Sequence, residues 1–100
     1  MSKVRFAIIG CGMIANFHAT AISRIPEAEL TGVFDDHSAS AQLFLKNWPV
    51  KLFSSLDELC ASGEVDAVCV CTPSGLHTAQ AVRVMEAGKH LVVEKPMSLS

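Results

Sequence analysis

The sequence predicts an α/β fold built on a doubly wound parallel sheet. Short apolar runs rich in valine, isoleucine and leucine alternate with segments of helical periodicity along the whole chain. The first apolar run ends at two closely spaced glycines. Polar residues that can bind a ligand or take part in a reaction follow several of the later runs. Strands and helices that alternate in this way usually form parallel strands joined by right-handed crossovers.

The expected strands are short, and one of them is almost entirely apolar. The sequence Ala-Val-Cys-Val-Cys at 67–71 has the composition of a strand that is buried on both faces of a parallel sheet. Turn-forming residues or prolines flank most of the other runs. The expected strands cover residues 3–9, 30–34, 51–53, 67–71 and 90–93.

The first expected helix follows the glycines directly. It places Ile14, Phe17, Ala21 and Ile25 at helical spacing, which predicts that these side chains form its apolar face. Pro26 marks its end, because proline is unfavourable in a helix interior.

The other three helices have recognisable start or stop signals. Ser38 can cap a second helix that reaches about Asn47. The sequence Ser-Leu-Asp-Glu at 55–58 has the form of a capping box and predicts a short third helix. The fourth helix is expected over about 76–87, with Gly88 as its stop signal.

The loop between the first strand and the first helix has the sequence Gly-Cys-Gly-Met-Ile-Ala. In this strand-to-helix context, G-x-G-x-x-A is the fingerprint of a dinucleotide-binding fold. Gly10 allows the tight turn, and Gly12 lets a diphosphate approach the backbone without meeting a Cβ atom. The first N–H groups of the helix are suited to bind an anion. The loop residues expected to contact a cofactor are Gly10, Cys11, Gly12, Met13 and Ile14.

An acidic residue stands where such a fold binds the adenosine ribose. Asp35 ends the second strand, twenty residues after Ala15, close to the usual spacing. A 2′-phosphate here would face Asp35 and Asp36 with no arginine beside them. Because like charges repel at short range, the sequence favours NAD over NADP. Asp36 itself is expected to be a solvated neighbour or a helix cap.

Composition argues against several other classes of protein. The net charge is −2 without a basic cluster, which gives no support for nucleic acid as a partner. The apolar runs are too short for a membrane span, and the N-terminus lacks the apolar core of a signal peptide. We therefore expect one soluble, cytoplasmic domain. The four cysteines lack metal-site spacing, so we expect reduced, mostly buried thiols and no metal site.

Taken together, these motifs resemble the N-terminal nucleotide-binding domain of the glucose–fructose oxidoreductase/inositol dehydrogenase/rhizopine catabolism (Gfo/Idh/MocA) family. The resemblance covers essentially the whole chain, and Glu-Lys-Pro after the fifth strand is its most specific mark. It implies a Rossmann-type NAD(P)-binding domain. The motifs that carry it are the glycine loop with His18, Asp35, Thr-Pro-Ser-Gly-Leu-His at 72–77 and Glu-Lys-Pro at 94–96.

The resemblance also implies roles for individual residues. Lys95 would lie beside the nicotinamide and hydrogen-bond the reacting hydroxyl group, where a fixed cation favours alkoxide character. Glu94 would contact the nicotinamide ribose, and Pro96 would shape the turn. Thr72 and Pro73 would line the dinucleotide groove.

Two histidines lie within the matching motifs. His77 falls in the first turn of a helix, where packing against the cofactor and a bond to nearby backbone both remain open. His18 lies near the expected apolar face of the first helix, and we expect a structural role for it.

Members of the family are usually NAD(P)-dependent oxidoreductases that transfer a hydride between nicotinamide and a hydroxyl-bearing carbon of a sugar, polyol or nucleotide sugar. The resemblance implies that residues 1–100 are the cofactor half of such a dehydrogenase, truncated at its C-terminal end. The absent second domain would carry the substrate pocket and general base, and would mediate homo-oligomer formation. The chain alone should therefore be inactive. The sequence at 72–77 also looks like the branch that oxidises nucleotide-linked acetamido sugars.

Two other functions remain open at this stage. A non-catalytic, nucleotide-sensing regulator would keep the fold, as does a yeast galactose-pathway corepressor of the same family. A missing histidine base in the second domain would favour the regulator, whereas the intact Glu-Lys-Pro argues against it. A sheet of this kind can also bind S-adenosylmethionine or coenzyme A, but those ligands do not require Asp35 together with Glu-Lys-Pro.

Overall fold

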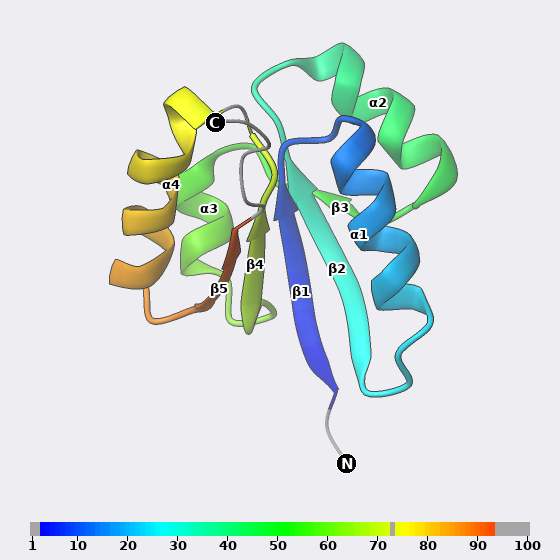
Figure 1. Ribbon diagram of the computed structural model, residues 1–100, viewed down its shortest axis with the longest axis horizontal. Helices are drawn as coiled ribbons and strands as arrows, with labels where there is room; N and C mark the ends of the chain where they lie inside the picture. Colours follow the sequence, from blue (N-terminus) through cyan, green and yellow to red (C-terminus); the bar gives the residue numbers. More distant parts are fainter. Residues whose placement is uncertain (1–2, 73, 94–100) are drawn as a thin grey trace, which may run out of the picture.

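A parallel sheet forms the centre of the molecule (Figure 1). The computed structural model describes residues 3–72 and 74–93. Within these residues the sheet has five strands in the order β3-β2-β1-β4-β5, and every pair of neighbours is parallel. This confirms the predicted doubly wound sheet. The strands are β1 (Val4–Ile9), β2 (Ala28–Phe34), β3 (Lys51–Leu52), β4 (Ala67–Val70) and β5 (His90–Val93).

Helices cover both faces of the sheet, which gives three layers (Figure 1). On one face lie α1 (Met13–Ser23) and α2 (Ser38–Asn47), and on the other lie α3 (Leu56–Ala61) and α4 (Ser74–Glu86). The chain moves outward from β1 to β3 and then crosses to β4, so the strand order reverses between β1 and β4. Such a switch point is where ligands bind in doubly wound sheets. The helices formed by the described residues are all too short or too polar to cross a membrane.

The side chains of β1 alternate between two apolar clusters, one on each face of the sheet. Ala7 and Ile9 pack with residues of α3 and α4, including Leu59 and Val84. Ile8 points the other way and packs with residues of α1 and α2. Burial on both faces explains why the central strands are continuously apolar.

The buried face of α1 differs from the prediction. Ala15, Ala19 and Ile22 are buried, whereas Phe17 is 67% exposed and Ile14 is 39% exposed. Ile25 was also expected on the apolar face, but it lies beyond the end of the helix and is exposed. Both sets of residues have helical spacing, so periodicity alone could not choose between them. The structure buries the set with two alanines, because their small side chains let the helix lie close to the sheet.

The helix starts confirm one predicted cap and correct another. Ser55 Oγ accepts a hydrogen bond from the Glu58 N–H at 3.0 Å, as the capping box predicts. The Glu58 carboxylate reaches one residue further back, to the N–H and hydroxyl of Ser54, and these bonds lower its pKa. Ser38 was expected to cap α2. It is instead the first helical residue, and the cap position belongs to His37.

A bulge in β2 brings a glycine against β3. The pairing of β1 with β2 shifts between Phe6 and Ala7, where the Thr31 hydroxyl donates to the Phe6 carbonyl at 3.1 Å. The next residue, Gly32, has no room for a side chain. A Cβ atom there would lie 2.5 Å from the Phe53 ring and 3.0 Å from the Lys51 carbonyl oxygen.

We predict that Gly32→Ala lowers the free energy of unfolding by about 1–3 kcal/mol, the usual cost of overpacking a tight site. Gly63→Ala is the matched control, because a Cβ atom at Gly63 would meet nothing within 4 Å. Urea denaturation of the two variants measures the difference. Equal urea denaturation midpoints for the two variants would show that the packing of residue 32 against Phe53 does not exclude a larger side chain.

Candidate functional site

The loop after β1 lies at the carboxyl edge of the sheet (Figure 1). Hydrogen bonds join it to the strands on both sides. The N–H of Gly10 donates to the Phe34 carbonyl at the end of β2, at 2.8 Å. On the other side, the N–H of Cys71 donates to the Ile9 carbonyl at 2.8 Å. Backbone hydrogen bonds therefore hold the glycine loop at the switch point of the sheet.

Gly10 is a glycine because the fold requires one. Its φ angle is +93°, in a region that L side chains rarely adopt. A Cβ atom would also lie 3.0 Å from the Thr72 methyl group and 3.1 Å from the Cys71 carbonyl carbon. The tight turn and the close approach to β4 both exclude a side chain.

Gly12 is different, since the protein itself does not need a glycine there. It is the N-cap residue of α1, with φ of −84° and ψ of −160°. These angles are open to any residue, and a Cβ atom would meet nothing within 4 Å. The N–H groups of the first turn that follows have no partner inside the helix. The open space above Gly12 thus fits a group that approaches the backbone closely, as a diphosphate does.

Asp35 fastens the glycine loop to the end of β2. One carboxylate oxygen accepts from the Cys11 N–H at 2.8 Å, and the other accepts from the His37 N–H at 2.8 Å. The side chain is only 14% exposed. Each carboxylate oxygen has further acceptor capacity, so these bonds leave room for ribose hydroxyls. The imidazole of His37 lies outside, 85% exposed, with Nδ1 3.6 Å from the carboxylate.

The Cys11 thiol packs beneath the loop and is not reactive. The side chain is buried in the cluster that includes Ile8 and Ala15. Burial, assisted by the nearby Asp35 carboxylate, raises the pKa of the thiol to about 12. The thiol is therefore neutral at physiological pH and fills space in the core.

Thr72 lies at the end of β4 and forms a polar contact that the sequence did not predict. Its hydroxyl donates to Oε1 of Gln80 on α4. Gln80 is a polar residue that is nevertheless buried, with an exposed fraction of 8%. The signal was present in the sequence. Gln80 lies four residues before the buried Val84, so a polar residue occupies the inner face of α4.

The structure describes some of the predicted site residues but not all of them. Pro73, Glu94, Lys95 and Pro96 lie outside the described residues, as does the side chain of His77. The predicted site residues that surround the carboxyl ends of β1, β2 and β4 are Gly10, Cys11, Gly12, Met13, Ile14, Asp35 and Thr72.

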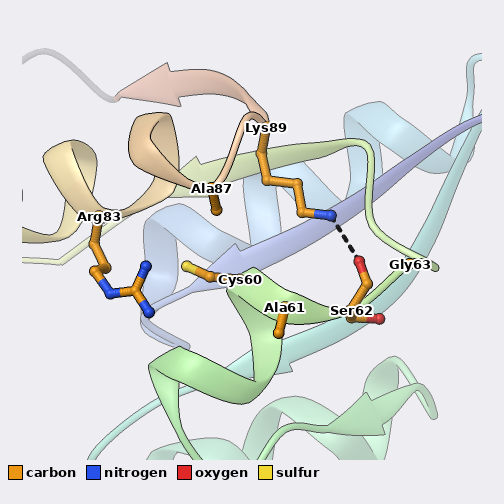
Figure 2. A pocket seen from close by; sticks show the side chains of 7 residues that line it. All are labelled: Cys60, Ala61, Ser62, Gly63, Arg83, Ala87 and Lys89. Carbon is orange, nitrogen blue, oxygen red and sulfur yellow. Dashed lines mark hydrogen bonds between the residues drawn. The ribbon is translucent and has the colours of Figure 1, made fainter.

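A separate hollow of about 390 Å³ lies at the opposite edge, between α3, α4 and the segments that enter β4 and β5 (Figure 2). Its cationic side chains already have partners. Lys89 donates to the carbonyls of Ser62 and Val65 at 2.6 and 2.7 Å, and Arg83 bonds to Asp57 at 2.6 Å. The Lys89 bonds stabilise the turn after α3, whereas the Arg83–Asp57 bond joins α4 to the first turn of α3.

Within the described residues, no three His, Cys, Asp or Glu side chains are grouped to hold a metal ion. All four cysteines lie in this part of the chain, and no disulfide joins them. Burial of Cys11, Cys60 and Cys69 agrees with the expectation of thiols in the core.

Comparison with known proteins identifies relatives across nearly the whole chain. A glucose-6-phosphate 3-dehydrogenase of Bacillus subtilis is 40% identical over 96 residues, which are 96% of this chain and 27% of the relative. The chain therefore spans less than a third of the length of this relative.

Two solved structures illustrate the structural likeness. The WlbA dehydrogenase of Bordetella pertussis, in complex with NADH and UDP-GlcNAcA, matches with a TM-score of 0.88 and 41% identity. The match covers 96% of this chain and 30% of that protein. Biliverdin reductase from Synechocystis, in complex with biliverdin and NADP⁺, matches with a TM-score of 0.87 and 30% identity, over 97% of this chain and 31% of that one.

A family profile also matches residues 4–100, and its description is an oxidoreductase family with an NAD-binding Rossmann fold. The match agrees with the strand order, the glycine loop and the acidic residue at the end of β2. The chain belongs to the Gfo/Idh/MocA oxidoreductase family and forms its NAD-binding Rossmann fold.

Proposed function

We propose that this chain is the cofactor-binding part of an NAD-dependent dehydrogenase that acts on a hydroxyl group of a sugar, polyol or nucleotide sugar. The observation that carries the proposal is the open space above Gly12. This glycine is not needed for the turn or for packing, so its missing side chain is best explained by a ligand. The N-terminus of α1 beside it suits the negative charge of a diphosphate.

Asp35 supports binding of the adenosine ribose. Its carboxylate is fixed by two backbone N–H groups, so it presents its remaining acceptor capacity in one orientation. Asp36 follows it and is exposed. A 2′-phosphate would meet both negative charges, and we therefore propose NAD as the preferred cofactor. The two solved relatives carry NADH and NADP⁺ respectively, so the preference has to be measured.

The proposed reaction centre follows β5. Lys95 would hydrogen-bond the reacting oxygen of the substrate and stabilise negative charge on it. Glu94 would contact the nicotinamide ribose, and Pro96 would shape the turn. The bound nicotinamide supplies hydride transfer. The relative named for glucose 6-phosphate and the relative solved in complex with UDP-GlcNAcA support a phosphorylated or nucleotide-linked sugar as substrate.

The two loop glycines give the first test of the proposal. Gly12→Ala should weaken NAD binding by about tenfold or more, because a methyl group would stand where the diphosphate approaches. Its free energy of unfolding should stay within about 1 kcal/mol of that of the unmodified chain. Gly10→Ala should instead destabilise the fold by about 1–3 kcal/mol through backbone strain.

Calorimetric titration with NAD and urea denaturation, each carried out on both variants, measure these effects. Undiminished NAD binding by a folded Gly12→Ala chain would remove the observation on which the proposed function rests.

A second prediction concerns Asp35. Asp35→Asn should weaken NAD binding by about 10- to 100-fold, the range expected for hydrogen bonds to a charged group, and should reduce the preference for NAD over NADP. Asp36→Asn makes the same change of charge one residue away and should have a much smaller effect on the NAD affinity. Titration of both variants with NAD and with NADP distinguishes a specific ribose contact from an effect of net charge. If the two substitutions have equal effects, net charge and not the ribose contact sets the affinity.

The third prediction concerns Lys95 in an enzyme that has the length of the relatives. Lys95→Ala should lower kcat by about 10²- to 10³-fold, the effect of removing one group that stabilises an oxyanion, and should leave the Kd for NAD nearly unchanged. Lys46→Ala, on the exposed side of α2, serves as control.

Full turnover by the Lys95→Ala variant would rule out the proposed role of this lysine. If the unmodified enzyme binds NAD but oxidises no sugar, polyol or nucleotide sugar, a nucleotide-sensing regulator becomes the better description.

A further inference from the structure

A chain of side-chain hydrogen bonds connects the end of α2 to the glycine loop. The indole Nε1–H of Trp48 donates to Oδ1 of Asn16 at 3.1 Å. Asn16 Nδ2–H in turn donates to the carbonyl of Gly12 at 3.3 Å. Trp48 and Asn16 are 32 residues apart in the sequence, so this contact depends on the tertiary fold.

The chemistry of tryptophan fixes the orientation of the Asn16 amide. An indole N–H can only donate, so the oxygen of the amide must face Trp48. The amide nitrogen then points toward Gly12, whose carbonyl can only accept. The direction of both hydrogen bonds follows from this pattern.

Trp48 is itself held firmly. It forms the C-cap of α2, with its backbone N–H bonded to the Phe44 carbonyl at 3.0 Å. Its ring packs against the cluster that includes Phe44 and Ala15. The indole N–H is therefore a fixed donor, and Asn16 gains a fixed partner on a different helix.

The Gly12 carbonyl belongs to the same peptide plane as the N–H of Met13. In a trans peptide the C=O and N–H bonds point in opposite directions. Two donors hold this carbonyl toward the body of α1, namely the Asn16 side chain and the Asn16 N–H, the latter at 3.4 Å. The N–H of Met13 must then point in the opposite direction, away from the body of α1.

We propose that Trp48 and Asn16 are positioning residues for diphosphate binding, acting through the orientation of the Gly12–Met13 peptide. The inference rests on the proposed function, because the oriented N–H needs a diphosphate to bind. Neither side chain has to touch the ligand. Their effect is to prevent rotation of this peptide before the ligand arrives, which lowers the cost of binding.

The test uses the 100-residue chain with three ligands: NAD, ADP and adenosine. Asn16→Ala removes the donor to Gly12, and Trp48→Phe keeps an aromatic ring in the core while removing the indole donor. Each should raise the Kd for NAD and ADP by about tenfold, the effect of weakening one charge-assisted hydrogen bond. The Kd for adenosine, which has no phosphate, should stay within about twofold by the same reasoning.

The double variant provides a stricter criterion. If both residues act on the same peptide, then Asn16→Ala combined with Trp48→Phe should bind ADP about as weakly as either single variant. Asn47→Ala, a neighbouring change at the end of α2, is the control and should bind all three ligands normally. Thermal unfolding confirms that each variant is folded, and Asn16→Ala keeps the test decisive if Trp48→Phe fails to fold.

The chain has a single tryptophan, so NMR shows a single indole N–H signal. In the unmodified chain this signal should shift with ADP and remain unchanged with adenosine. Tight ADP binding by Asn16→Ala, or an equal loss of adenosine affinity, would overturn the inference and leave the proposed function intact. Failure of the unmodified, folded chain to bind NAD or ADP would overturn the proposed function and this inference with it.

Discussion

The close approach of Gly10 to the end of β4 is the constraint on which the rest of the site depends. The backbone of Gly10 lies where even a methyl group would press on Thr72 and Cys71. This contact sets the distance between the first loop and β4, and with it the point where α1 begins. Hydrogen bonds from Gly10 to Phe34 and from Cys71 to Ile9 secure the loop from both neighbouring strands. Backbone hydrogen bonds therefore fix the glycine loop at the switch point of the sheet.

The two glycines of the loop serve different purposes, although they look alike in the sequence. Gly10 satisfies the geometry of the protein, whereas a Cβ atom at Gly12 would meet nothing within 4 Å. Asp35 combines both purposes, because the carboxylate that would accept ribose hydroxyls also holds the N–H of Cys11. A site built in this way is preorganised, since the bonds that form it are bonds of the fold.

The sequence predicted the sheet, because the sheet follows from local patterns. Alternating apolar and helical segments determined the parallel sheet, and chain order alone brought Gly10, Asp35 and Thr72 to one edge. Contacts between distant segments could not be read in this way. The buried face of α1 was predicted wrongly because residues 14, 17 and 21 have the same periodicity as 15, 19 and 22. The bonds from Thr72 to Gln80 and from Trp48 to Asn16 depend on how helices pack, which periodicity does not specify.

The polar contacts of the domain differ between the two edges of the sheet. At the amino edge, Lys89 binds two carbonyls and Asp66 binds the backbone and guanidinium of Arg5, which lowers the pKa of that carboxylate. These contacts hold together parts of the protein and leave little capacity for a ligand. At the carboxyl edge, Asp35 retains acceptor capacity beyond its two backbone bonds, and the N–H groups in the first turn of α1 have no partner inside the helix. This asymmetry follows from the parallel sheet, in which each helix begins at the edge where the preceding strand ends, so the free N–H groups of the first helical turns gather at the carboxyl edge.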